Sequence, residues 1–141
     1  MNFFKNFSFT FIFILTLLCA SSKAHGMTKK SYIDIYVLIM DCTERSLLWV
    51  EKHKEDTQLA SLALAIAETN IKILQDISPP KEFIEIHPHL ISVVENSANA
   101  FESLVNGSKM SFYKYKKSVD KERKALYEVM RELNIILPTI I

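Results

Sequence analysis

The stretch that decides the fold is "TQLASLALAIAETNIKILQDI", residues 57–77. At about 100° per residue, its apolar side chains fall on one face of a helix. The predicted inward face consists of Leu59, Leu62, Ala63, Ile66, Ala67, Asn70, Ile73, Leu74 and Ile77. Pro79 and Pro80 follow, and a residue that precedes proline resists the α conformation. The sequence therefore predicts a helix over residues 57–77.

Residues 31–53 predict an earlier helix with a wide apolar arc that includes Tyr36. Ser31, followed three residues later by Asp34, matches a capping-box pair at its start. The polar stretch "KHKEDT", residues 52–57, interrupts the apolar pattern. Asp56 or Thr57 is then expected to cap the helix over 57–77.

A third helix is predicted after the double proline, over residues 80–105. Its apolar face keeps one phase through Phe83, Ile86, His87, Leu90, Val94, Ser97, Phe101 and Leu104. Pro88 falls on the opposite side, where an interior proline bends a helix without removing core contacts. We therefore expect one kinked helix. The alternative is a helix that begins afresh at Pro88, with His87 as its cap.

The last predicted helix covers residues 109–135. "NGS", residues 106–108, combines a helix stop with a cap, and Pro138 ends the pattern. The whole chain contains only two glycines, which disfavours strands and hairpins. Four helices with short connections predict an all-α, up-down-up-down four-helix bundle.

The N-terminal sequence "MNFFKNFSFTFIFILTLLCASSKAHG" has the pattern of a secretory signal peptide. Its apolar run is too short to span a bilayer comfortably. We expect cleavage of residues 1–24, just before His25, which leaves one domain over residues 25–141. The mature protein is then periplasmic or secreted. A retained membrane anchor and a lipid anchor at Cys19 are the alternatives.

The expected mature chain has a net charge of −1, which gives no reason to expect nucleic-acid binding. It keeps a single cysteine, Cys42, so only an intermolecular disulfide is possible. Cations and aromatic residues gather in "KMSFYKYKK", Lys109 to Lys117. This segment is a solvated basic face or a contact for acidic lipid headgroups or an acidic partner.

Helix lengths place several inward polar residues at one height near the proline end of the bundle. This predicted layer consists of Tyr36, Asn70, His87, Arg123 and Tyr127. Such a layer fixes the register of the helices when its members satisfy one another. Alternatively it lines a pocket for a small anion, a carboxylate or a porphyrin.

The turns "SPPK", residues 78–81, and "NG", residues 106–107, resemble those of the periplasmic four-helix b-type cytochromes. The resemblance covers the second half of the chain and implies an exported up-down bundle. That family holds haem between a Met early in the first helix and a His late in the last. Here Tyr127 lies near the histidine position, and Met40 comes too late in the first helix. With the axial pair missing, and no C-x-x-C-H present, we expect no haem and no other bound cofactor.

Metal sites are weakly indicated. His87 and His89 are two residues apart, so on a helix their side chains point about 200° apart and cannot share an ion. His25 would chelate copper only as the mature N-terminal residue. No nucleophile–base pair or phosphate loop is visible. The sequence thus predicts an exported, non-enzymatic bundle that binds a protein partner or small ligand. The alternative is a ligand- or cofactor-binding relative of the bundle cytochromes with a pocket at His87.

Overall fold

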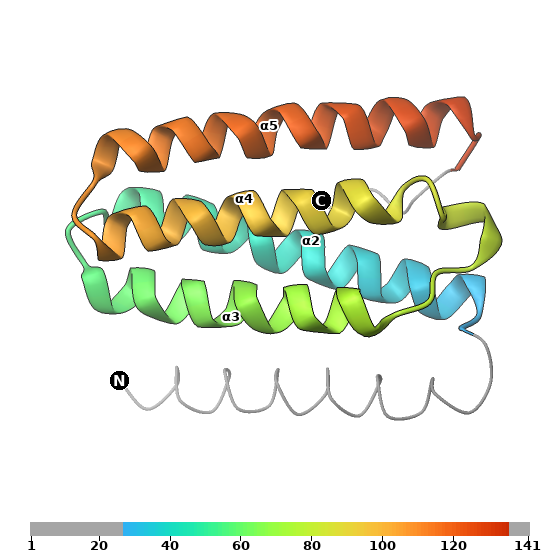
Figure 1. Cartoon of the computed structure of the whole chain (residues 1–141), viewed down its shortest axis with the longest axis horizontal. Helices are drawn as coiled ribbons and strands as arrows, with labels where there is room; N and C mark the ends of the chain where they lie inside the picture. Colours follow the sequence, from blue (N-terminus) through green and yellow to red (C-terminus); the bar gives the residue numbers. More distant parts are fainter. Residues whose placement is uncertain (1–26, 136–141) are drawn as a thin grey trace.

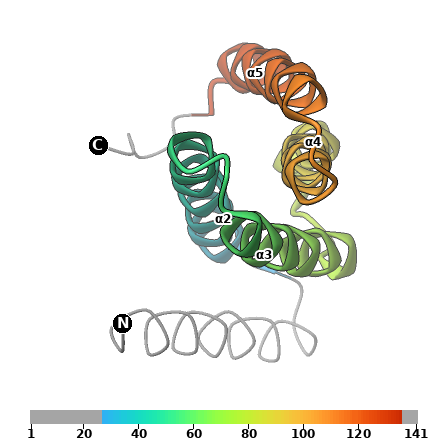
Figure 2. The same cartoon turned by 90° about the vertical axis from the view of Figure 1, so that its left-hand side faces the viewer.

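The computed structural model describes residues 27–135, which form four α-helices and one short 3-10 helix. The α-helices are α2 (Lys29–Lys52), α3 (Thr57–Asp76), α4 (His87–Val105) and α5 (Lys109–Glu132). Each runs antiparallel to the one before it, and viewed end-on they occupy four corners (Figure 1, Figure 2). The described residues contain no strand, so the predicted all-α class and four helices are confirmed. The expected signal peptide, Cys19 and His25 lie outside the described residues.

The start of α2 differs from the capping box that the sequence predicts. The helix begins at Lys29, and Thr28 is its N-cap, because the Thr28 side chain accepts a hydrogen bond from the Ser31 backbone amide. Asp34 forms a surface ion pair with Lys30 at 2.9 Å. Threonine and serine cap helices by the same chemistry, so two such residues three positions apart leave the choice open in sequence.

Small residues line the buried side of α3. The helix is capped by Asp56, one of the two expected caps, which accepts from the Leu59 amide. Its buried residues are Ala60, Ala63, Ala67, Asn70 and Leu74. Leu62, expected inside, is 44% exposed. The buried face is therefore centred on the alanines, which let α4 approach closely.

The single kinked helix expected over 80–105 is replaced by two elements. A 3-10 helix, η1, covers Lys81–Phe83, and α4 begins only at His87. Ile84 and Ile86 between them keep helical dihedrals, which explains why the apolar phase runs on unbroken. Pro88 lies in the first turn of α4, where the backbone amide that proline lacks has no helical partner to lose. The structure is thus closer to the alternative of a fresh start at this proline.

The α4–α5 connection is a tight turn at Gly107. This residue has φ +77°, a left-handed conformation that glycine adopts without strain. The turn brings the Ser108 amide to 2.7 Å from the Ser103 carbonyl. Ser108 then caps α5 by accepting from the Ser111 amide.

The core is apolar and its polar members are satisfied locally. Thr43 and Ser97 are buried, and each hydroxyl donates to the carbonyl four residues earlier in its own helix. Every buried side-chain nitrogen or oxygen in residues 27–135 has a hydrogen-bond partner. The largest fully buried side chains include Tyr32, Phe83 and Phe101.

Candidate functional site

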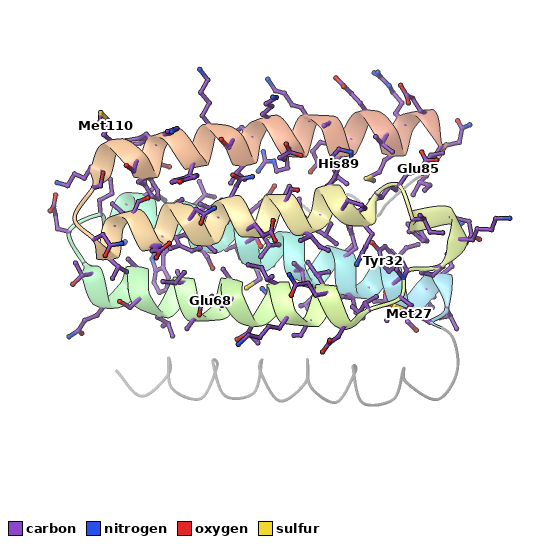
Figure 3. The ribbon with its side chains drawn as sticks, in the orientation of Figure 1. Met27, Tyr32, Glu68, Glu85, His89 and Met110 are labelled. Carbon is purple, nitrogen blue, oxygen red and sulfur yellow. The ribbon has the colours of Figure 1, made fainter. Side chains whose placement is uncertain are left out.

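His87 joins three helices at the proline end of the bundle. This residue is the first of α4 and is 8% exposed. Its Nδ1 lies 2.9 Å from the hydroxyl of Tyr32 on α2, and its Nε2 lies 2.9 Å from the carbonyl oxygen of Leu74 on α3. The Tyr32 ring also stacks on Phe83 of η1, with ring centroids 4.6 Å apart. Figure 3 labels Tyr32 beside this end of the bundle.

The geometry sets the protonation of the His87 ring. The Leu74 carbonyl can only accept, so Nε2 carries a hydrogen and donates it. Burial lowers the pKa of His87 despite the bond to Leu74, so the ring is neutral at pH 7 and Nδ1 is an acceptor. The Tyr32 hydroxyl therefore donates to Nδ1, while burial raises its own pKa. Both ring nitrogens are engaged in structural hydrogen bonds.

Asn70 belongs to a separate contact. Its buried side chain and that of Ser46 both lower the pKa of the Cys42 thiol. Burial raises that pKa by more than these two neighbours lower it. The thiol is half-buried and stays protonated at neutral pH, which makes it a poor nucleophile. An intermolecular disulfide through Cys42 stays a prediction.

The other three members of the expected polar layer lie at the seam between α2 and α5. The Tyr36 hydroxyl is buried and donates to the sulfur of Met130 at 3.6 Å. Arg123 is one-third exposed and binds Glu44. Tyr127, expected inside, is 49% exposed. The expected inward position of Tyr127 is therefore wrong, although the charges of Tyr127 and Arg123 still act on the pKa of Tyr36. A register layer or a ligand pocket at these residues stays a prediction.

Ion pairs form a ladder along this α2–α5 seam, which sequence reasoning missed. The pairs are Glu44–Arg123 at 2.7 Å, Glu51–Lys116 at 2.7 Å, and Glu55–Lys109. Lys54 also donates to the Tyr113 hydroxyl. Two acids on α2, Glu44 and Glu51, are seven residues apart, and so are their partners on α5, Arg123 and Lys116. Seven residues make about two helical turns, so the two pairs lie at corresponding heights on the two helices. That heptad spacing of opposite charges is the signal in the sequence.

The ladder divides the basic segment Lys109–Lys117. Lys109 and Lys116 face α2, whereas Lys114 and Lys117 are exposed. Two more exposed lysines follow on the same face of α5, at spacings of three and four residues. We call the four together the lysine stripe: Lys114, Lys117, Lys121 and Lys124. None of these four makes an ion pair within residues 27–135.

The lysine stripe lies on the outer side of the bundle. In Figure 2, α5 packs beside α4 and turns its opposite side away from the other helices. Met110, four residues before Lys114, heads the same face and is 84% exposed. It projects from the start of α5 away from the other helices (Figure 3). The candidate functional site is this outer face of α5.

Charge is distributed unevenly over the described residues. Helix α5 carries eight Lys and Arg against four Asp and Glu, a net charge of +4. Residues 27–108 carry seven against twelve, a net charge of −5. Exposed acids on α3 and α4 include Glu68, Glu95 and Glu102. The net charge is therefore positive on α5 and negative over residues 27–108.

Other features of the described residues are less specific. An open depression of about 430 Å³ lies against α2, lined by Asp41, Cys42, Arg45, Ser46, Leu48, Trp49 and Lys52. His89, which Figure 3 labels on α4, has its Nδ1 atom 3.3 Å from a carboxylate oxygen of Glu122 on α5. Residues 27–135 contain no group of three or more His, Cys, Asp or Glu arranged to hold a metal ion. Within the same range, no helix has both the length and the apolar character needed to cross a bilayer.

We compared the chain with known proteins by sequence and by structure. No protein-family model, curated protein or solved structure matches this chain.

Proposed function

We propose that this chain is an exported, non-enzymatic helical bundle that binds an acidic partner surface through the lysine stripe of α5. The observation that carries the proposal is the stripe itself: four exposed lysines on one face, with no ion pairs among the described residues. Like charges spaced three and four residues apart on a helix repel one another, and an anionic surface relieves that repulsion. Export is supported by the signal-peptide pattern of residues 1–24.

The ion-pair ladder supports the assignment of the site to the outer face. Lys109 and Lys116 are already neutralised by Glu55 and Glu51, so their charge serves the contact between α2 and α5. The stripe contributes nothing comparable to the folded state. Its removal should therefore affect binding without affecting stability.

Retention of the purified mature protein on an anionic matrix tests this function. We expect retention at low salt, although the net charge of the mature chain is −1, because a local basic face governs the contact. Replacing Lys114, Lys117, Lys121 and Lys124 with Gln should abolish it.

The matched control changes the same amount of charge elsewhere. It carries Gln at four other exposed lysines: Lys29, Lys52, Lys72 and Lys81. We expect this control to be retained almost as well as the native protein. Equal loss of retention in the two variants, or no retention of the native protein, contradicts the proposal.

A further inference from the structure

We infer that the acidic surface is the headgroup layer of an anionic phospholipid membrane, on which α5 lies lengthwise. This inference rests on the proposed function, because it names the partner of the same lysine stripe. Lys114 to Lys124 extends about 15 Å along a single helix face at 1.5 Å per residue. A line of charges on a convex outer face meets a flat plane along its whole length.

Met110 distinguishes a membrane from a purely charged partner. It is the most exposed large apolar side chain among residues 27–135, and it lies on the same face as the lysines. Interfacial helices combine a basic polar surface with apolar side chains that enter the headgroup boundary. An acidic polypeptide offers the lysines the same charge but gives Met110 no apolar layer to enter.

The acidic side of the bundle favours one orientation on such a plane. Helix α3 lies diagonally across the bundle from α5 (Figure 2), and Glu68 on α3 is labelled in Figure 3. Glu95 and Glu102 are exposed on α4. An anionic membrane repels these carboxylates while it attracts the stripe. The approach with α5 foremost is therefore the most favourable one.

Co-sedimentation with vesicles tests the inference. One set contains phosphatidylcholine alone, and the other contains phosphatidylcholine mixed with phosphatidylglycerol. We expect binding to the mixed vesicles only, and weaker binding as salt rises. Each surface lysine contributes about fivefold to the partition constant, so replacing all four stripe lysines with Gln should lower it more than about a hundredfold. The control variant with Gln at Lys29, Lys52, Lys72 and Lys81 should bind nearly as well as the native protein.

Two further measurements separate this inference from the proposed function. Met110→Ser should weaken binding to the mixed vesicles severalfold while leaving retention on the anionic matrix unchanged. Immobilised polyglutamate is the probe for an acidic polypeptide. If the native protein binds polyglutamate but sediments no better with anionic than with neutral vesicles, the membrane inference is overturned and the proposed function stands. If it binds neither probe, both fail, and the stripe is a solvated face.

Discussion

His87 bonds to a backbone group of α3 and to a side-chain group of α2 that lie beside it in the core. The Leu74 carbonyl belongs to the last turn of α3, where carbonyls lack helical donors. It accepts from the Ile77 amide at 3.2 Å and from His87 at 2.9 Å. The Tyr32 hydroxyl is equally dependent on the imidazole. At this position the polar side chain completes the packing of three helices.

Replacing His87 with Leu should destabilise the fold. The Tyr32 hydroxyl would lose the imidazole as its partner in the core, and an unsatisfied buried group costs about 1–3 kcal/mol. The Leu74 carbonyl would lose one of its two donors and keep the Ile77 amide. We expect a loss of roughly 2–4 kcal/mol in the free energy of unfolding, measured with urea. Tyr32→Phe alone should cost about 1–2 kcal/mol. The double variant should lose less than the two single losses together, and strict additivity would contradict a direct Tyr32–His87 bond.

The stability of the fold should depend on pH through His87. Burial depresses the folded-state pKa of His87 below its ordinary value of 6.5, so below that value the unfolded chain binds more protons than the folded one. Stability from this group is therefore complete above pH 6.5 and falls as the pH drops towards the folded-state pKa. His87→Gln keeps a donor and an acceptor but does not titrate. Urea unfolding between pH 8 and pH 5 should show a smaller decline for this variant, and parallel curves would refute the assignment.

For single residues, the sequence predicted burial better than it predicted contacts. Its pattern predicts that Tyr36, Asn70 and His87 face inward, and all three are buried. Tyr127 is adjacent to Leu126, and a difference of one residue decides which of the two enters the core. Tyr32 lies on the buried face of α2, but the partner of its hydroxyl depends on the relative height of two helices. The helical period of a sequence predicts which way a side chain faces, but it does not predict which residue on another helix that side chain contacts.

At the scale of elements, the seams of the bundle are closed by different means. Buried alanines on α3 and α4, such as Ala63 and Ala98, allow those two helices to pack closely. Between α2 and α5, long charged side chains span the distance instead. Surface ion pairs contribute little individually, about 0.2–1 kcal/mol, and salt weakens them. We therefore expect α2–α5 to be the seam most sensitive to ionic strength.

Charge reversal tests the α2–α5 ladder. Glu44→Lys places two cations together and should lower the free energy of unfolding by about 1 kcal/mol, as should Arg123→Glu. The double reversal restores an opposite-charge pair and should recover at least half of the combined loss. Asp34→Lys is the control, because its ion pair with Lys30 is largely exposed and should matter by less than about 0.5 kcal/mol. Urea midpoints that show no recovery in the double variant would argue against the ladder.

The connection between α3 and α4 was the element that the sequence did not resolve. A proline in mid-helix and a proline in a first turn leave the same apolar phase when the intervening residues keep helical dihedrals, as Ile84 and Ile86 do. Only the backbone hydrogen bonds distinguish a mid-helix proline from a first-turn proline, and the spacing of apolar residues carries no information about those bonds. The other connections were better marked, since Asp56 and Gly107 have a local conformational reason for their positions.

At the scale of the whole molecule, export is open to a direct test. The signal-peptide pattern predicts that expression of the full chain in a secreting host yields a mature protein that begins at His25. N-terminal sequencing and intact mass should show the loss of residues 1–24. An intact N-terminus on protein recovered from the membrane fraction would favour the retained anchor, and a lipid-modified Cys19 would favour a lipoprotein.

The uneven charge of the bundle also bears on how quickly it finds its target. With +4 on α5 and −5 over residues 27–108, the molecule carries a permanent electric dipole across its width. The field above an anionic surface extends about one Debye length, near 8–10 Å in physiological salt. Within that distance the dipole turns the molecule before contact, so a larger fraction of collisions is productive. Association should therefore slow with added salt more than dissociation hastens, a kinetic signature that a short-range apolar contact would not produce.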